Sequence, residues 1–348
     1  MTLRIGRLMK PHIVGDECKD VDAEVGEFDS LALLQKSSDG WAYQLIAMLT
    51  LILPILGLGL AALDVWNYGW SWIDIGLLLL MYTWAVLGIE LGFHRYLTHR
   101  SLKTNRCMRA FFIVSGCMAG HGQPIWWCAI HRRHHQYSDH YGDPHSPNLH
   151  GGGFIGALRG GWHSHLGWMF EPQCTAAYAT HFTKDLLNDR NILFLDRHYV
   201  TWVLLGLAIP AALGGSLAHS WHGAWSGFLW GGLVRMFLDQ HALWWGIVTV
   251  CHRFGYRTFQ SNDKSTNHWL IAILFLGDGW HNNHHAFPAS ARVGHAWWEY
   301  DPTWSVIQFL SWFGLVWDMK VPSVESIRQK RLTSLPSNAT NVITTENE

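Results

Sequence analysis

A long uncharged apolar segment sets the strongest limit on how this chain can fold. Residues 41–63 contain no Asp, Glu, Lys or Arg, and about 20 apolar residues are enough for a helix to cross a bilayer. A segment inside lipid must satisfy its own backbone hydrogen bonds, which a single stretch achieves as a helix. Three further apolar runs follow, at residues 72–92, 199–218 and 226–251. The sequence therefore predicts an all-α integral membrane protein with four transmembrane helices.

The positions of the basic residues predict the orientation of these helices. The short segments 64–71 and 219–225, which join successive apolar runs, contain no Lys or Arg. Lys and Arg favour the cytoplasmic side of a membrane, so we expect both chain termini to be cytoplasmic. Residues 93–198 and 252–320 then form a cytosolic helical cap on the four spans. We expect the membrane to be a bacterial plasma membrane rather than the endoplasmic reticulum.

Composition limits the remaining segments and the partners. We expect a polar N-terminal arm at residues 1–40, a membrane domain at 41–320 and a disordered C-terminal tail at 321–348. The mean hydropathy of +0.04 fits a few spans with a large polar cap. The formal net charge is -1, and no basic stripe indicates a nucleic-acid partner.

Histidines recur with a spacing that suits metal binding. The chain contains 23 His, and the pattern HRRHH at residues 131–135 returns as HNNHH at residues 281–285. Positions i, i+3 and i+4 share one face of a helix, and neutral imidazole is the commonest metal ligand among side chains. One such pattern in a His-rich chain is weak evidence. Two of them, with further histidines at the ends of two apolar runs, indicate a metal centre.

The number of histidines near the predicted membrane surface calls for two metal ions. Nine imidazoles exceed the ligand number of one ion, and a set of nitrogen ligands favours iron, zinc or copper over magnesium or calcium. The nine candidate ligands are His94, His99, His131, His134, His135, His252, His281, His284 and His285. Carboxylates commonly accept a hydrogen bond from the other nitrogen of a ligand imidazole. The candidates for that role are Glu90, Asp139, Asp143 and Asp278.

The pair His94 and His99 has a different spacing from the other candidates. Residues five apart lie about 140° from each other around an ideal α-helix. Either the helix ends between the two residues, or each of them binds a different metal ion. We expect the second arrangement, in which the two rings belong to separate metal sites.

These segments carry a resemblance to a known family. Three segments resemble the three histidine boxes of the membrane fatty acid desaturases. They are HRYLTH (94–99), HRRHH (131–135) and HNNHHAFP (281–288). Similarity to the Δ9, stearoyl-CoA-desaturase-like branch is carried by GFHRYLTHRS (92–101), DPHSP (143–147), HLGW (165–168) and CHRFGYR (251–257). The resemblance covers residues 40–320. It implies four spans, a cytosolic cap, a non-haem centre of two iron ions and a bent acyl tunnel.

The resemblance also implies a reaction and roles for single residues. The Δ9 branch uses O2 to insert a cis double bond into a saturated C16–C18 acyl chain. The nine histidines named above correspond to the iron ligands of the family, with His252 the isolated one. Trp127 matches a tryptophan at the tunnel kink, and Tyr82 matches the residue that closes the tunnel. The alternative role of Trp127 is to anchor the chain at the membrane interface, and the alternative for Tyr82 is an ordinary side chain that faces lipid. Where the family has an Asn that holds a metal-bound water, this chain has Val248.

The implied substrate determines the class of chemistry and the partners. No side chain can deprotonate an unactivated methylene group, so redox metal chemistry with O2 is required. The substrate is a long-chain acyl-CoA or acyl-lipid, and electrons come from a separate donor, cytochrome b5-like or ferredoxin-like with its reductase. Arg132, Arg133 and Lys184 are candidates for contacting an acidic donor or a CoA phosphate. We expect these three to be solvated surface charges instead.

Three other functions fit part of the pattern. A di-iron membrane hydroxylase of a lipid, alkane or carotenoid has related boxes, commonly with HxxxH first, whereas four residues separate His94 from His99. A zinc hydrolase needs a carboxylate base, as in HExxH, and the sequence has no such motif. A metal transporter needs polar residues along its spans, and the apolar runs contain few. The desaturase is the function that accounts for all three boxes.

Overall fold

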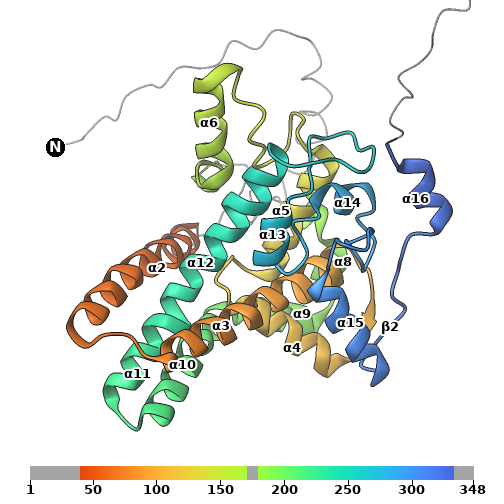
Figure 1. Ribbon diagram of the computed structural model, residues 1–348. Coiled ribbons are helices and arrows are strands. Elements are labelled where there is room, and N and C mark those ends of the chain that lie inside the picture. Colours follow the sequence, from red (N-terminus) through yellow and green to blue (C-terminus); the bar gives the residue numbers. More distant parts are fainter. Residues whose placement is uncertain (1–39, 171–178, 333–348) are drawn as a thin grey trace, which may run out of the picture. The chain divides into compact units, whose positions relative to one another are not determined.

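The computed structural model describes residues 40–170 and 179–332. The chain divides into two compact units, residues 1–46 and 47–348, and of the first only the beginning of helix α2 is described. Most of the predicted N-terminal arm therefore lies outside the described residues. In the second unit almost all of the described secondary structure is helical, as the sequence predicts (Figure 1).

In the described part of the chain, three helices are long and apolar enough to cross a membrane. Helix α2 (Gly40–Tyr68) meets this condition over Met48–Tyr68, and helix α10 (Tyr199–Ala218) meets it over its whole length. Helix α3 (Trp72–Leu87) continues without a break into the π-helix η1 (Gly88–Thr98), and together they form the third candidate. Each of the three coincides with a predicted span.

The fourth predicted span, residues 226–251, is helical but differs from the other three. Within the described residues it is not among the helices that meet the length and composition condition. It belongs to a continuous helical segment made of α11 (Trp221–Gly227), the π-helix η5 (Phe228–Val234), α12 (Arg235–His241), the π-helix η6 (Ala242–Thr249) and the 3-10 helix η7 (Val250–His252). The structure thus shows three candidate spans, and the fourth stays a prediction.

A buried ion pair explains why charges interrupt this fourth run. Arg235 Nη1 and Asp239 Oδ2 are 3.3 Å apart, and both side chains are buried. The guanidinium also donates hydrogen bonds to the carbonyl oxygens of Met118 (2.7 Å) and Gly206 (3.2 Å). Met118 is the C-terminal cap of helix α4 (Arg106–Cys117). Because a buried helix end needs partners for its last carbonyl groups, Arg235 stabilises the end of α4.

The chain turns sharply after α4. Gly122 adopts a φ of 103°, a conformation that glycine reaches without steric cost. Helix α5 (Pro124–Tyr137) then begins at a proline, which suits the first helical position because an N–H there would have no partner within the helix. His121 Nε2 lies 3.1 Å from the carboxylate of Asp239, which ties the turn to the fourth helical run. Helix α5 carries the HRRHH segment.

Two glycines allow η1 to lie directly against α4. A Cβ atom added to Gly88 would lie 2.3 Å from the backbone nitrogen of Gly116, and one added to Gly92 would lie 2.6 Å from the carbonyl oxygen of Phe112. Neither contact can be relieved by a side-chain movement, because the opposing atoms belong to the backbone. The close approach therefore sets the position of η1 and of His94, which follows two residues after Gly92.

Short helices and one small ladder complete the region after the candidate spans. Strands β1 (Lys103–Thr104) and β2 (Val316–Trp317) pair antiparallel and join the segment after η1 to the C-terminal part of the chain. The remaining elements are α6 (Gly153–His165), η2 (Gly167–Phe170), α7 (Ala179–Phe182), α8 (Lys184–Leu187), α9 (Arg190–Arg197), α13 (Trp269–Leu274), α14 (His281–Ala286), α15 (Pro302–Trp312) and α16 (Val324–Lys330).

Part of the segment that we expected to be disordered is ordered. Helix α16 falls within residues 321–348 and begins at Ser323, whose hydroxyl accepts a hydrogen bond from the backbone N–H of Ser326 at 3.1 Å. Lys330 Nζ donates to the carbonyl oxygen of Ala286 at 2.6 Å. These contacts supply fixed partners that the composition of the segment does not reveal. Residues 333–348 lie outside the described part of the chain.

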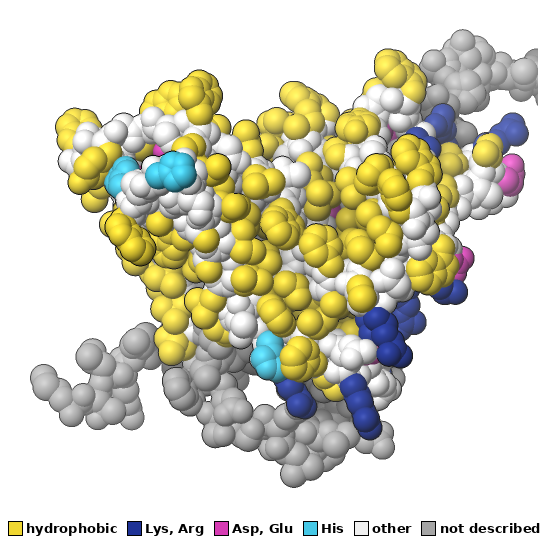
Figure 2. Space-filling model, turned by 90° about the horizontal axis from the view of Figure 1, so that it is seen from below, with side chains coloured by type: hydrophobic (Ala, Val, Ile, Leu, Met, Phe, Trp, Pro, Cys, Tyr) yellow, Lys and Arg dark blue, Asp and Glu magenta, His cyan; other side chains and the backbone are white. Residues whose placement is uncertain are grey.

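Exposed hydrophobic side chains cover the candidate spans. Leu56, Leu63, Leu79 and Leu204 are each more than half exposed. Figure 2 shows one face of the structure with a broad hydrophobic surface and with Lys and Arg gathered at its edge. Soluble proteins rarely expose contiguous apolar surface of this kind. It is the surface that helices in contact with lipid require.

Candidate metal centre

All nine candidate histidines lie together, although they come from four separate segments. The first segment is η1 with its C-terminal cap, the second is α5, the third is η7 and the fourth is α14. The ring nitrogens fall into two groups, and within each group the candidate ligand atoms lie within 4.8 Å of one another. The first cluster consists of His94, His99, His131, His135 and His284, and the second cluster consists of His134, His252, His281 and His285.

His94 and His99 lie in the same cluster, so the expectation that they belong to separate sites was wrong. Their ring centroids are 4.9 Å apart. The reason is the π-helix η1, whose hydrogen bonds join residues five apart. The backbone N–H of His99 donates to the carbonyl oxygen of His94 at 3.1 Å. In this geometry a spacing of five residues returns to the same side of the helix.

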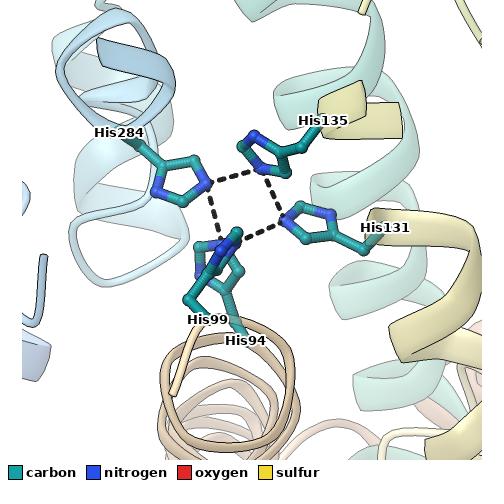
Figure 3. A group of neighbouring side chains, drawn as sticks. All are labelled: His94, His99, His131, His135 and His284. Atoms are coloured by element: carbon teal, nitrogen blue, oxygen red, sulfur yellow. Dashed lines mark hydrogen bonds between the residues drawn. The ribbon is translucent and has the colours of Figure 1, made fainter. Parts of the chain in front are cut away.

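Figure 3 shows how the rings of the first cluster converge from η1, α5 and α14. His284 Nε2 lies 3.1 Å from His94 Nε2 and 2.8 Å from His135 Nε2. His131 Nε2 lies 3.0 Å from His135 Nε2 and 3.2 Å from His99 Nε2. Two nitrogens about 2.1 Å from one ion and at right angles to each other would be roughly 3.0 Å apart. The observed distances fit neighbouring ligands of a single ion.

The second cluster has the same construction. His281 Nε2 lies 3.1 Å from His252 Nε2 and 3.0 Å from His285 Nε2. The ring centroids of His134 and His252 are 5.0 Å apart. The rings of this cluster are nearly completely enclosed by protein, so an ion bound there would exchange its water shell for imidazole nitrogens.

Carboxylates lie behind the rings of the second cluster, as predicted for two of them. His252 Nδ1 donates to Asp139 at 2.9 Å, and His134 Nδ1 donates to Asp143 at 3.0 Å. A third carboxylate, Asp263, was missed. It accepts a hydrogen bond from His285 Nδ1 at 2.6 Å, but it lies in a polar loop whose sequence has no periodic pattern, so nothing in the sequence pointed to it.

The other two predicted carboxylates flank a ring of the first cluster. His94 Nδ1 lies 3.4 Å from Glu90 Oε2 and 3.5 Å from Asp278 Oδ1. Burial raises the pKa of Asp278 to about 7, and the nearby carboxylate of Asp301 acts in the same direction against the charge of Arg95. All four carboxylates that the sequence analysis named therefore contact a candidate ligand.

The protonation of these groups leaves nitrogen lone pairs pointing at one another. Burial would raise the pKa of Asp139, Asp143 and Asp263, but their imidazole partners lower it well below the usual range. An ionised carboxylate only accepts hydrogen bonds, so the facing Nδ1 carries the proton and Nε2 is left with its lone pair. Burial, together with neighbouring imidazoles, also lowers the pKa of rings that have no carboxylate behind them. These rings are His131, His135, His281 and His284.

Converging lone pairs repel one another unless a cation lies between them. The donor set is made entirely of neutral imidazole nitrogen, which suits iron, zinc or copper. The carboxylates on the opposite side of the rings are the partners that metal-binding imidazoles usually have. Both clusters therefore have the chemistry and the spacing to bind metal ions.

The residues between the histidines of the third box brace α14. Asn282 Oδ1 accepts hydrogen bonds from the backbone N–H groups of Thr258 and Phe259, each at 2.8 Å. Asn283 Nδ2 donates to Glu299 at 2.7 Å. Both asparagines are fully buried. They connect the helix to neighbouring segments and so hold its histidines in position.

The arginines of the second box have a similar role, contrary to our expectation of solvated charges. Arg132 Nη1 donates to Asp185 Oδ1 at 2.7 Å and is largely covered. Arg133 Nε donates to the carbonyl oxygen of Gly142 at 2.8 Å, and its side chain is buried. Both therefore anchor α5 to its surroundings. Lys184, at the start of α8, is exposed as expected.

A cavity lies beside both clusters. His131 of the first cluster borders the cavity, as do three rings of the second cluster. The apolar part of its wall includes Ile130, Leu243, Trp244 and Ile247. The cavity therefore has a largely apolar wall next to both candidate metal positions.

Two residues singled out by the resemblance lie in the cavity wall and one does not. Trp127 lines the cavity and stacks on His131, with ring centroids 5.0 Å apart and an interplanar angle of 18°. Val248 also lines it and presents only methyl groups. Tyr82 is not part of this wall. Its hydroxyl donates to the carbonyl oxygen of Leu274 at 2.7 Å.

Comparison with known proteins agrees with this site. A family model described as fatty acid desaturase matches residues 70–318. The Hex-5-enoyl-(acyl-carrier protein) acetylenase of Moorena producens (strain JHB) is 42% identical over 283 residues, which cover 81% of this chain and 87% of that relative. The sn-1 stearoyl-lipid 9-desaturase of Anabaena variabilis is 39% identical over 269 residues, covering 76% and 91%. An acyl-CoA 5-desaturase of Anemone leveillei is 39% identical over 259 residues, covering 74% of each chain.

The matched region contains every histidine of both clusters. The relatives include enzymes that act at different positions and on different acyl carriers, so the shared feature is the reaction family rather than one substrate. The chain belongs to the fatty acid desaturase family.

Proposed function

We propose that this chain is an O2-dependent fatty-acyl desaturase that inserts a cis double bond at the Δ9 position of a saturated C16–C18 acyl chain. The observation that carries the proposal is an apolar cavity bordered by both imidazole clusters. A methylene group in such a cavity has no proton that a side chain can remove, so the reaction needs redox chemistry. The relative that acts at position 9 of a stearoyl-lipid supports the choice of position.

We propose that each cluster holds one iron ion. The ions would supply the one-electron and O2 chemistry that side chains lack. The proposed iron ligands are His94, His99, His131, His135 and His284 for the first ion, and His134, His252, His281 and His285 for the second. Asp139, Asp143 and Asp263 orient ligand rings by accepting the Nδ1 proton, which is the usual function of such partners.

The contribution of the protein to the reaction is placement. Holding the reacting groups in the correct geometry removes much of the entropic part of a barrier. Trp127, stacked on His131, would border the acyl chain beside the first cluster, and Val248 belongs to the wall of the same cavity. We propose that Tyr82, on α3, closes the far end of the tunnel when the acyl chain is bound. The apolar wall excludes water from the reacting carbons.

We also propose that the fourth helical segment, Trp221 to His252, is a fourth span and that both termini are cytoplasmic in a bacterial plasma membrane. The three candidate spans and the exposed hydrophobic surface support this arrangement. Substrate would arrive as a long-chain acyl-CoA or acyl-lipid. Electrons would come from a separate cytochrome b5-like or ferredoxin-like donor with its reductase.

Expression in a host that lacks Δ9 unsaturation tests the activity. Mass spectrometry of the fatty acids is expected to show a new cis monoene, and the purified protein is expected to contain two irons per chain. A protein that is present and loaded with iron but yields no new monoene would disprove the activity. A metal content well below two per chain would contradict the proposed centre.

A second candidate function has specific support. The relative at 42% identity is an acetylenase that acts on an alkenoyl group attached to acyl-carrier protein. The same centre would then convert an existing double bond into a triple bond. Feeding the expressing host with a monoene as well as with saturated acids separates the two functions, because an alkyne product would appear only in the second case.

A further inference from the structure

The second cluster has one ring fewer than the first, and a histidine outside both clusters lies beside it. The first cluster has five imidazoles and the second has four. The wall of the cavity that both clusters border also contains Val248 and His145. Val248 offers no polar atom. His145 is 6% exposed, and its ring centroid lies 4.5 Å from that of His134.

His145 is placed in the same way as the rings of the second cluster. Its Nδ1 lies 3.7 Å from Asp143 Oδ1, the atom that also accepts the hydrogen bond from His134. The buried Nδ1 of His145 has no hydrogen-bond partner among the described residues. A movement of roughly half an ångström would bring it within hydrogen-bond distance of that carboxylate. The backbone N–H of His145 already donates to Asp143 at 3.1 Å, which fixes the residue at this position.

The ring of His145 belongs to the cavity wall. When Nδ1 carries the proton and faces a carboxylate, Nε2 has the lone pair and accepts hydrogen bonds. The ring belongs to neither of the two clusters, but it forms a smaller group with His134 and Asp143, whose candidate ligand atoms lie within 4.8 Å of one another. It therefore stands where it can receive a hydrogen bond from a molecule bound at the open side of the second cluster.

We propose that His145 positions a water molecule at the open side of the second cluster. The proposal rests on the proposed function, because it takes the second cluster to be a metal site. A water in a cavity needs polar partners, and Val248, which lines the same cavity, supplies none. His145 is thus a positioning residue, which acts on the second metal site through the water that it holds.

Cobalt binding to the full-length, iron-free protein tests this proposal through a readout other than activity. Loss of such an outer partner typically lowers metal affinity about 10- to 100-fold. We expect His145→Ala to lower the cobalt affinity of one of two sites by this factor, to leave the other site unchanged, and to alter the visible absorption of the bound cobalt. The matched control is His140→Ala. His140 belongs to the same loop, is exposed, and pairs through Nδ1 with the carbonyl oxygen of Ser138.

A second variant separates water positioning from packing. In the His145→Ala background, Val248→Asn places an amide in the wall of the same cavity. We expect this second substitution to restore most of the lost cobalt affinity. Unchanged affinity at both sites in His145→Ala would overturn the proposal. So would a loss of affinity that Val248→Asn does not recover, because the ring would then act by packing alone. If the unmodified protein binds neither cobalt nor iron, the proposed metal centre itself is wrong.

Discussion

Asp263 accepts a hydrogen bond from Nδ1 of His285 at 2.6 Å, although the two residues lie 22 positions apart in the sequence. The carboxylate is held independently of the ring. Its Oδ1 also accepts hydrogen bonds from the backbone N–H of Ser265 at 3.0 Å and from the hydroxyl of Ser261 at 2.7 Å. The position of Asp263 therefore fixes the orientation of His285, and the polar loop around it is part of the candidate metal centre.

Asp263→Asn should weaken metal binding at the second cluster without unfolding the protein. The amide keeps the size of the side chain but removes the negative charge that favours the Nδ1-protonated ring. Changes of this kind typically cost about 10- to 100-fold in metal affinity. Iron per chain, measured after dialysis against a chelator, should fall toward one. Asp318→Asn is the control, because Asp318 is exposed and pairs with Lys103 at the surface. Equal iron retention in the two variants would contradict the prediction.

Arg235→Met should destabilise the protein strongly. It leaves the buried carboxylate of Asp239 without its cation and removes the donor to the carbonyl oxygen of Met118. Breaking one partner of a buried pair costs about 3–5 kcal/mol, which thermal unfolding in detergent can measure. The double variant Arg235→Met with Asp239→Leu should be more stable than the single variant, because no unpaired charge remains. Arg328→Ala, on the exposed side of α16, should change the unfolding temperature little.

Gly92→Ala should disturb the first cluster although it adds only a methyl group. The new Cβ would lie 2.6 Å from the carbonyl oxygen of Phe112, so η1 and α4 must move apart. Overpacking of this kind costs about 1–3 kcal/mol, and His94 would move with η1. Gly76→Ala is the matched control in the preceding helix α3, because a Cβ there meets no atom within 4 Å. Thermal stability and iron content should both fall in Gly92→Ala and should both remain unchanged in Gly76→Ala.

Tyr82→Ala should lengthen the preferred acyl chain if Tyr82 closes the tunnel as we propose. Fatty acid analysis of the expressing host measures the chain length of the products. Tyr82→Phe keeps the ring and loses only the hydroxyl that bonds to Leu274, so its products should match those of the unmodified protein. An unchanged profile in Tyr82→Ala would place the end of the tunnel elsewhere. Trp244, which lines the cavity, is then the residue to vary next.

Much of the fold follows from patterns that the sequence displays directly. The spans around α2, α3 and α10 are continuous apolar runs, and their helices coincide with the predicted segments. The convergence of the histidine boxes follows from their number and their i, i+3, i+4 spacing. Glu90 and Asp278 were found because they stand close in sequence to candidate ligands.

What could not be predicted depends on contacts between distant segments or on helix type. Asp263 reaches His285 through the folding of a loop. Arg132 looks like a surface charge in the sequence, but its partner Asp185 lies more than fifty residues away. The sharing of one cluster by His94 and His99 required knowledge that η1 is a π-helix, which propensity and periodicity do not reveal.

The π-helical turn of η1 has a consequence for comparing related chains. Such a turn accommodates one more residue than an α-helical turn, so it is equivalent to a single-residue insertion that the helix absorbs locally. Deleting one residue between His94 and His99 would leave HxxxH, which an α-helix also presents on one face. The two spacings can thus offer the same pair of imidazoles to one ion. The number of residues between the two histidines of the first box therefore depends on whether the helix there is α or π. By itself, this number does not separate desaturation from hydroxylation.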